Sequence, residues 1–503
     1  MGLRDFTLAD VFRRNARLHR DGLAFVYEGE RTGHAEYLAR LRRTAGALAG
    51  LGLQPGDRLA VVADNSQLFM DAFGAAAALG LIFTPINVRL AAEEVGATLA
   101  NAEPRVVLVQ PSYEPLLAGV RGSLPGAERW LQLGPDGSGD RFEALLADGA
   151  ELPSEGDAGA PCAMIYTAAV AGRPRGALLS HANLIAAATG VGVNWRLGPD
   201  DVHLGLLPLF HVAGLLLTLA ANQVGGASVL MPRFDPEAAL RHIERERASF
   251  FLSFPPILDT ILDAAERGRA DLSSLRVVTG LESPETAARL EAAAPAARFW
   301  SAYGQAELSG LATMSPFREC PGSAGRPSFG NVVAILDEAD RPVATGTVGD
   351  IAVRGATVFG GYWRDVAGTA DTFRNGWHHT GDTGRFDADG YLWYAGRSPA
   401  KELIKPGGEN VYPAEVEAAL REHPAIAEAS VIGVPDPTWG EAVKAVCVLA
   451  PGETATAEEV IAFVGERIAR YKRPRHVVFV RALPRTAAGA VDRAAIKTEH
   501  GAP

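Results

Sequence analysis

The sequence predicts an α/β protein with a large N-terminal domain of layered sheets and a small, mobile α+β C-terminal domain. The chain has 503 residues, which is too long for one ordinary hydrophobic core. Short apolar runs alternate with Ala- and Leu-rich stretches of helical spacing through the first three quarters, a pattern typical of layered α/β sheets. The composition changes near residue 397. We therefore expect domains at 1–397 and 398–503, with a hinge at 397–402, near Lys401.

Individual elements follow from the same patterns. Thr456 and Glu459 form a capping box that starts a helix, and the apolar residues Val460 and Val464 after it share one helical face. Continuous apolar runs predict buried strands at 59–63, 105–110, 163–167, 250–254 and 276–279 in the first domain, and at 431–434, 445–449 and 476–480 in the second.

The composition argues against several classes of protein. The formal charge of −11 disfavours nucleic-acid binding, because phosphate contacts need clustered Lys and Arg. Three widely spaced cysteines without a CxxC pair indicate reduced thiols rather than a zinc or redox site. The start of the chain lacks the apolar core of a signal peptide, and no apolar run is long enough to span a bilayer. We expect a cytoplasmic protein without a transmembrane segment; its oligomeric state stays open, with a homodimer as one option.

Common catalytic motifs are missing from the sequence. It contains no GxxxxGK[ST] phosphate loop, no HExxH metal motif and no GxSxG nucleophile elbow. A GxGxxG match begins at Gly190 but has Trp195 at its third glycine position. The pair His378 and His379 has no partners at metal-ligand spacing. An α/β-hydrolase reading therefore has no nucleophile.

The sequence does contain a series of short motifs in a fixed order. The first is the loop 166–176 (YTAAVAGRPRG), of a kind that points backbone N–H groups at phosphates, although an ordinary hairpin loop has a similar composition. The later motifs are PLFHVAG at 208–214, YGQAE at 303–307, GSAGRP at 322–327, GDIAVRG at 349–355, WHHTGD at 377–382, GGENVYPAEVE at 407–417 and LPRT at 483–486.

This ordered series resembles the adenylate-forming superfamily, which includes acyl-CoA synthetases, firefly luciferase and the adenylation domains of peptide synthetases. The resemblance covers essentially the whole chain, and the joint order and spacing of the motifs make it specific. It implies that ATP activates a carboxylic acid as an acyl-adenylate, and that the acyl group then passes to the thiol of coenzyme A. Positioning and charge neutralisation supply most of the rate in such a transfer.

The resemblance implies roles in adenylation for four residues. Glu307 would hold Mg²⁺, since a hard cation suits a carboxylate, and His211 would lie between the acyl carboxylate and the α-phosphate. Thr167 is the hydroxyl that remains in the phosphate loop, and Arg175 is the cation at its end. A surface Glu and a structural His are the alternative interpretations.

The resemblance also implies an adenosine site. Tyr303 would stack on adenine, and Asp382 would accept hydrogen bonds from both ribose hydroxyls, with Arg397 nearby. A core aromatic and a turn-forming Asp are the structural alternatives. The remaining nucleotide-binding residues are expected in the segment 280–283, against the other face of adenine, and next to Tyr303: Gly280, Glu282, Ser283 and Gly304.

Transfer to coenzyme A needs a second arrangement of the active site. Members of the family rotate the C-terminal domain between the two half-reactions, a hinge motion of the kind that gates many enzymes. Gly407 and Gly408 would then line the pantetheine tunnel, since only glycine lets a backbone approach a ligand so closely. The alternative is a surface turn before a helix that starts near Ala414.

The chain departs from the family pattern at three places. Its phosphate loop reads Ala-Ala-Val-Ala at 168–171, with Arg175 where relatives have Lys. Ala306 replaces a Thr, and Ala490 replaces the lysine that follows Gly in the last motif. Losing one preorganised charge-stabilising contact costs roughly 10²–10³ in rate. Activity then requires another cation to compensate, and the available arginines are Arg173, Arg175, Arg485 and Arg493.

The sequence thus predicts an acyl-CoA synthetase that uses ATP, Mg²⁺ and coenzyme A. The alternative is a degenerate relative that binds acyl-CoA or nucleotide without efficient adenylation. No Arg precedes Tyr303, which disfavours a dicarboxylate, so we expect a hydrophobic monocarboxylic acid, either aromatic or a fatty acid such as a long-chain one. The apolar residues expected near the acyl group are Val212, Leu215, Leu216, Phe254, Pro255, Pro256, Trp300 and Leu308.

Overall fold

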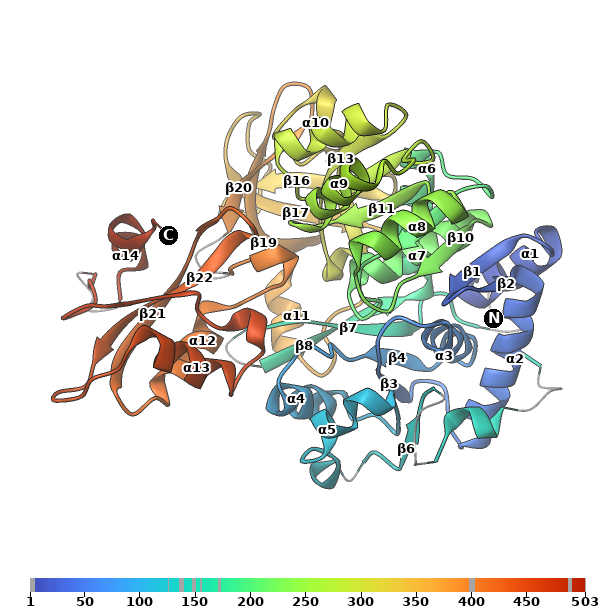
Figure 1. Ribbon diagram of the computed structural model, residues 1–503, viewed down its shortest axis with the longest axis horizontal. Helices are drawn as coiled ribbons and strands as arrows, with labels where there is room; N and C mark the ends of the chain where they lie inside the picture. The colour runs from blue at the N-terminus through green and yellow to red at the C-terminus, as the bar shows by residue number, and fades with distance from the viewer. Residues whose placement is uncertain are drawn as a thin grey trace.

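The computed structural model describes residues 5–124, 126–134, 140–146, 151–153, 156–170, 173–397, 403–486 and 491–502 (Figure 1). The predicted hinge segment 398–402, including Lys401, lies outside the described residues, as do Ala171 and Ala490. The boundary between 397 and 398 and the mobility of the C-terminal domain therefore stay predictions.

A six-stranded sheet in the first part of the chain has the order β6-β5-β3-β4-β7-β8. Along β3 (Arg58–Val62), Leu59 and Val61 pack into one core, whereas Ala60 and Val62 pack into another on the opposite face. Side chains alternate across a strand, so a continuous apolar run fits a sheet that is buried on both faces. The other strands are β4 (Ile82–Pro85), β5 (Val106–Val109), β6 (Arg129–Gln132), β7 (Pro161–Val170) and β8 (Arg173–Ser180).

A nine-stranded sheet has the order β15-β14-β13-β12-β11-β9-β10-β1-β2. In β11 (Phe250–Ser253), Phe250 and Leu252 face the core shared with the first sheet, and Phe251 faces the other side. The remaining strands are β1 (Leu23–Tyr27), β2 (Glu30–Gly33), β9 (Val202–Gly205), β10 (Ala227–Leu230), β12 (Val277–Gly280), β13 (Arg298–Gln305), β14 (Gly310–Pro316) and β15 (Arg326–Pro327).

Helices cover both faces of the two sheets. The central core contains α3 (Gln67–Ala78), α6 (His181–Trp195) and α7 (Val212–Val224). Helix α7 is buried on all sides from Val212 to Asn222, which fits its nearly continuous apolar sequence. The outer helices are α8 (Pro236–Glu246), α9 (Ile257–Gly268) and α10 (Pro284–Ala293) on the nine-stranded sheet, and α4 (Ala92–Ala102) and α5 (Glu114–Leu117) on the six-stranded sheet. Two more helices, α1 (Leu8–Leu18) and α2 (His34–Gly50), pack beside α3.

A five-stranded sheet follows, in which β16-β17-β19-β18 form the path and β20 pairs with β19. Its order brings the TGD motif on β19 next to Arg397 at the end of β20, since Asp382 pairs with Arg397 across the two strands. The elements are β16 (Asn331–Leu336), β17 (Gly349–Gly355), α11 (Val366–Thr372), β18 (Phe373–Arg374), β19 (Trp377–Phe386) and β20 (Leu392–Arg397).

The C-terminal elements gather at one end of the molecule, around a three-stranded sheet in the order β21-β22-β23 (Figure 1). The capping box at Thr456 is present and starts α13, whose Val460 and Val464 are buried against the sheet, as predicted. The elements are α12 (Pro413–Arg421), β21 (Ile426–Asp436), β22 (Gly440–Leu449), α13 (Ala457–Gly465), β23 (His476–Phe479) and α14 (Arg493–His500). The predicted fold class, layered α/β sheets followed by a small C-terminal domain, is confirmed.

None of the helices in the described part of the chain combines the length and the apolar character that a bilayer span requires.

Candidate active site

A cavity of about 390 Å³ lies where the C-terminal domain meets the N-terminal domain. Thr167, which lies on β7 in the predicted phosphate-binding loop, and His211 line the cavity from the N-terminal domain. Glu409 and Asn410 line it from the C-terminal domain. Other lining residues come from the segment leading into α4, from α4 itself, from α12 and from the segment 467–472. Motifs that are distant in the sequence therefore share one cavity.

His211 occupies the N-cap of α7, where its Nδ1 accepts a hydrogen bond from the Ala213 N–H at 3.2 Å. Burial lowers the pKa of His211; the Glu409 carboxylate opposes this shift, while Lys405 and Arg89 add to it. The imidazole is thus neutral at physiological pH. With Nδ1 engaged as an acceptor, Nε2 carries the proton and is a hydrogen-bond donor.

Glu307, in the 3₁₀ turn Ala306–Leu308, is 5% exposed and accepts a hydrogen bond from the Tyr362 hydroxyl at 2.8 Å. The Arg175 guanidinium lies over the Tyr362 ring, 5.1 Å from its centroid, and its Nε is 3.3 Å from Asp365 Oδ2. Tyr362 therefore links the predicted metal-binding carboxylate to the predicted phosphate-binding cation. The sequence analysis missed Tyr362, which belongs to no motif that we identified.

Thr167 lies opposite Arg175 on the antiparallel pair β7 and β8, and its hydroxyl is 3.5 Å from the Arg175 carbonyl oxygen. Three of the predicted adenylation residues, Thr167, Arg175 and Glu307, are thus joined through short contacts with one another or with Tyr362. His211 shares the cavity with Thr167.

The Tyr303 hydroxyl donates a hydrogen bond to Asp382 Oδ2 at 2.8 Å. Asp382 is 6% exposed, and Arg397 Nε is 3.7 Å from its Oδ1, beyond hydrogen-bond distance. That Oδ1 is buried without a hydrogen-bond partner in the described structure. Burying a carboxylate oxygen without a hydrogen-bond donor costs free energy, so this oxygen is suited to accept a hydrogen bond from a ligand hydroxyl.

The other predicted nucleotide residues lie at the carboxyl ends of β12 and β13. Gly280 has φ +141°, and a Cβ there would lie 1.8 Å from the Ser253 carbonyl oxygen, so no other residue fits. Gly304 likewise has the Gly310 carbonyl oxygen where a Cβ would be. Ser283 caps α10 by accepting from the Thr286 N–H, which favours its structural role.

Glu282 is partly buried beside the end of β11, where the Ser253 hydroxyl donates to its Oε1 at 2.6 Å. Burial raises the pKa of Glu282 to about 7, against the opposing effect of the Ser253 hydrogen bond. This carboxyl group therefore titrates near neutral pH.

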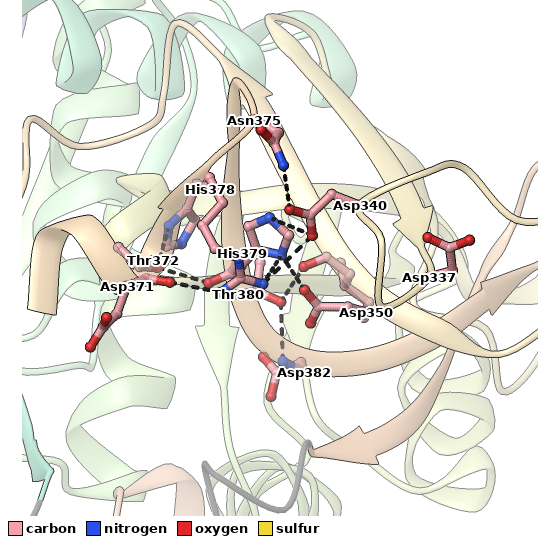
Figure 2. Close-up of polar contacts among 12 residues, drawn as sticks. Asp337, Asp340, Asp350, Asp371, Thr372, Asn375, His378, His379, Thr380 and Asp382 are labelled. Carbon is pink, nitrogen blue, oxygen red and sulfur yellow. Dashed lines mark hydrogen bonds and ion pairs between the residues drawn. The ribbon is translucent and has the colours of Figure 1, made fainter.

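Figure 2 shows the strand that carries Asp382. His379 lies between the carboxylates of Asp340 and Asp350, and its Nε2 is 3.5 Å from Asp340 Oδ1. The sequence analysis gave His379 no partners, because both carboxylates are supplied by the turn and strand that precede β18. The described residues nevertheless contain no group of three or more His, Cys, Asp or Glu side chains arranged to hold a metal ion.

Gly407 and Gly408 form a turn with positive φ that packs against the N-terminal domain. A Cβ on Gly408 would lie 2.6 Å from the Phe254 ring, and one on Gly407 would lie 2.8 Å from the Trp439 ring. Both glycines thus approach aromatic side chains closely. That they line a pantetheine tunnel stays a prediction.

Lys472 joins the two domains, and no motif in the sequence had indicated it. Its Nζ lies 2.5 Å from Glu94 Oε1 on α4 and 2.7 Å from Glu415 Oε2 on α12, with only 5% of the side chain exposed. Burial lowers the pKa of Lys472, but the carboxylates of Glu415 and Glu94 outweigh burial and raise it overall. The lysine is thus charged throughout the neutral range.

The expected acyl-binding residues separate into two groups. Leu215, Leu216 and Leu308 are at most 1% exposed and belong to the hydrophobic core. Phe254, Pro255, Pro256 and Trp300 are only partly buried. None of these four residues lines the cavity that contains His211, so their role in binding the acyl group stays a prediction.

Two of the arginines proposed to replace the missing lysine are engaged elsewhere. Arg485 binds Glu428 at 2.6 Å, and Arg493 binds Glu417 at 2.6 Å, all within the C-terminal domain. Arg175 remains as the cation next to the predicted catalytic carboxylate.

Comparisons with known proteins identify the family of the chain. The family model of the AMP-binding enzyme matches residues 12–363, and the model of the AMP-binding enzyme C-terminal domain matches residues 415–490. The indoleacetate–CoA ligase of Aromatoleum aromaticum is 36% identical over 96% of this chain and 96% of its own. The feruloyl-CoA synthase of an Amycolatopsis species is 34% identical over 97% of this chain and 98% of its own.

A solved structure, that of a candidate long-chain-fatty-acid CoA ligase from Rhodopseudomonas palustris, is 48% identical to this chain. It superposes with a TM-score of 0.76 and covers 79% of this chain and 100% of its own. The chain therefore belongs to the AMP-binding enzyme family, in the branch of the AMP-forming acid–thiol ligases.

Proposed function

We propose that this protein is an ATP-dependent acyl-CoA synthetase for a hydrophobic monocarboxylic acid. The observation that carries the proposal is the joint position of Thr167 and His211 in a cavity whose opposite wall belongs to the C-terminal domain. The N-terminal wall provides Thr167 and His211 as partners for an activated acid, and the C-terminal wall faces them across the cavity.

In the first half-reaction, an oxygen of the acid attacks the α-phosphorus of ATP, and the bond to pyrophosphate breaks. Asp382 and Tyr303 hold the ribose and adenine, since Asp382 Oδ1 is a buried acceptor without a protein donor. Arg175 and Thr167 position the phosphates, and neutral His211 donates from Nε2 to the forming acyl phosphate.

Mg²⁺ fits at Glu307 as a partner of the substrate phosphates. The donor is a hard carboxylate oxygen, and the described residues contain no group of three or more His, Cys, Asp or Glu side chains that could hold a metal ion, so phosphate oxygens and water would complete the coordination. The ion would neutralise phosphate charge. The Tyr362 hydroxyl holds the Glu307 carboxylate in place from the other side.

In the second half-reaction, the coenzyme A sulfur attacks the acyl carbonyl carbon, AMP leaves with the electrons of the broken C–O bond, and the thiol proton is released. The cavity gives the thiol a path to His211 between α4 and the segment 467–472. The turn at Gly407 and Gly408 brings the C-terminal wall into place.

The proposed acid is apolar and carries one carboxylate, aromatic or fatty. The support for this is the apolar character of the partly buried residues Phe254, Pro255, Pro256 and Trp300, which the family resemblance expects near the acyl group. Burying a second, unpaired carboxylate there would be costly. The names of two relatives, which concern feruloyl and indoleacetyl groups, favour aromatic acids first.

The test is a pyrophosphate-release assay with ATP, Mg²⁺, coenzyme A and a panel of acids: ferulate, indoleacetate, benzoate, octanoate, palmitate, malonate and succinate. We expect release that depends on an apolar monocarboxylate, with matching AMP formation. Preference for malonate or succinate would contradict the acid assignment. A protein that binds acyl-CoA but releases no pyrophosphate with any acid would instead be a binding protein.

A further inference from the structure

We propose that Thr380 is a positioning residue for nucleotide binding, which holds the carboxylate of Asp382 in place through a bulge in β19. This inference rests on the proposed function, because it assigns a role toward the ATP that the function requires. Figure 2 shows Thr380 between the backbone of β17 and that of Asp382.

The bulge follows from the pairing of β17 with β19. Asp350 pairs with Thr383, and the next pair is Ala352 with His379. Only Ile351 thus lies between the pairs on β17, while three residues, 380 to 382, lie between them on β19. Gly381 within the bulge has φ +72°, a conformation that favours glycine. Bulges of this kind redirect a side chain at the cost of ladder hydrogen bonds.

The Thr380 hydroxyl replaces the ladder hydrogen bonds that the bulge removes. Its Oγ1 donates to the Ile351 carbonyl oxygen at 2.6 Å and accepts from the Asp382 N–H at 3.2 Å. Thr380 is 1% exposed, so neither backbone group has water as a ready substitute. One hydroxyl group therefore connects the backbone of Asp382 to the neighbouring strand.

The base of the bulge is fixed independently of Thr380. His379 forms ion-pair contacts with Asp340 and Asp350, and Thr372 donates to the His379 carbonyl oxygen at 2.8 Å. On the other side, Asp382 pairs with Arg397 on β20. Removal of the Thr380 hydroxyl should consequently loosen the bulge, together with the contact that this hydroxyl also makes with Tyr303, without melting the sheet.

The bulge positions the side chain of Asp382, one of whose carboxylate oxygens is the proposed acceptor for the nucleotide. Asp382 Oδ2 is held by the Tyr303 hydroxyl, whereas Oδ1 has no hydrogen-bond partner in the described structure. A shift in the Asp382 backbone would move both oxygens together. The effect should therefore appear in nucleotide affinity and leave the acid site unaffected.

The test compares Thr380→Val, which keeps the shape and removes the hydroxyl, with Thr380→Ser, which keeps the hydroxyl. Thr84→Val is the matched control, because Thr84 is also fully buried in a strand and its hydroxyl donates to a local carbonyl, that of Ile82. Thr380→Ala serves as a second variant if Val does not fold. For each protein, the Kd for ATP, the KM for ATP and for the acid, and the Tm are measured.

We expect Thr380→Val to raise the Kd and KM for ATP about tenfold, as the loss of a buried hydrogen bond would. The KM for the acid should stay unchanged, and Thr380→Ser should restore ATP binding. Unaltered ATP binding in Thr380→Val, or an equal loss for ATP and acid, would overturn the proposal. A parent protein that binds no ATP would overturn the proposed function together with this inference, so the two failures are distinguishable.

Discussion

The ammonium group of Lys472 in the C-terminal domain lies 2.5 Å from the carboxylate of Glu94 at the start of α4. The same carboxylate accepts the backbone N–H of Ala469 at 2.9 Å, while Glu415 keeps its own contact with Lys472 inside the C-terminal domain. Glu94 is therefore one residue through which the N-terminal domain holds the C-terminal domain in the observed arrangement, and Arg89, which pairs with Glu409, is another.

Replacing Glu94 with Gln should weaken this arrangement. Breaking a buried ion pair leaves a charge short of a partner, but Glu415 remains, so we expect the docked form to lose about 1–2 kcal/mol. Thioester formation from a supplied acyl-adenylate should slow about tenfold, as such a loss implies. Adenylation, measured by pyrophosphate exchange, should not slow.

Glu237→Gln is the control for this variant, because Glu237 lies in the first turn of α8, is exposed, pairs with Arg267 and does not line the cavity. An equal effect of the two substitutions, or a loss of both half-reactions in Glu94→Gln, would show that the ion pair does not act through docking.

Glu307→Gln should sharply reduce Mg²⁺-dependent turnover. The amide keeps the size of the side chain and can still accept from Tyr362, but it lacks the charge that a hard cation prefers. The measurement is a Mg²⁺ titration of pyrophosphate release. Glu246→Gln provides a control of similar burial at a distant ion pair with Arg31. Superimposable titrations of Glu307→Gln and the parent would make Glu307 structural.

Glu282→Gln should stabilise the protein at pH 8 relative to the parent. The folded pKa of Glu282, about 7, is above its ordinary value, so the folded state binds the proton more tightly than the unfolded state does. Folding stability therefore decreases as the pH rises from about 4.5 to 7. The Gln side chain does not titrate, so the folding stability of the variant does not decrease for this reason. We expect about 1–3 kcal/mol more stability for the variant at pH 8, and a smaller difference at pH 5, by urea denaturation. A difference that does not change with pH would contradict the assignment.

Arg175→Ala should depress adenylation severely, and Ala490→Lys should accelerate it. Arg175 is the cation that the structure places next to Tyr362 and Glu307, whereas Arg485 and Arg493, two of the other three candidates, are paired within the C-terminal domain. Single-turnover measurement of each half-reaction tests both variants. Thioester formation from supplied adenylate should be unchanged in Ala490→Lys, and an effect on neither half-reaction would make the missing lysine irrelevant.

The elements that the sequence predicted are those with local signals. The capping box of Thr456 and the alternating apolar faces of β3 and β11 depend on residues a few positions apart, so periodicity is enough to find them. The motif residues were found because short motifs are contiguous. Their roles as metal and nucleotide ligands stay predictions.

The residues that the sequence did not reveal act over long separations. Tyr362 meets Glu307 across 55 positions, and Lys472 meets Glu94 across 378. A single tyrosine or lysine of this kind belongs to no local sequence pattern. Its contacts form only when distant elements pack against each other. The partners of His379 were missed for the same reason, since Asp340 and Asp350 approach it only after β17 pairs with β19.

The cavity beside His211 has walls from both domains, and this has a consequence for how its occupant is selected. A site built from two bodies exists only in the fraction of molecules in which the bodies meet. The apparent Kd of any ligand of the cavity equals its intrinsic Kd divided by that fraction. A ligand that binds there also increases the docked population. Glu94, Glu415 and Lys472 line the cavity as well as joining its two walls, so a substitution at Glu94 would change both the docked fraction and the surface that the ligand meets.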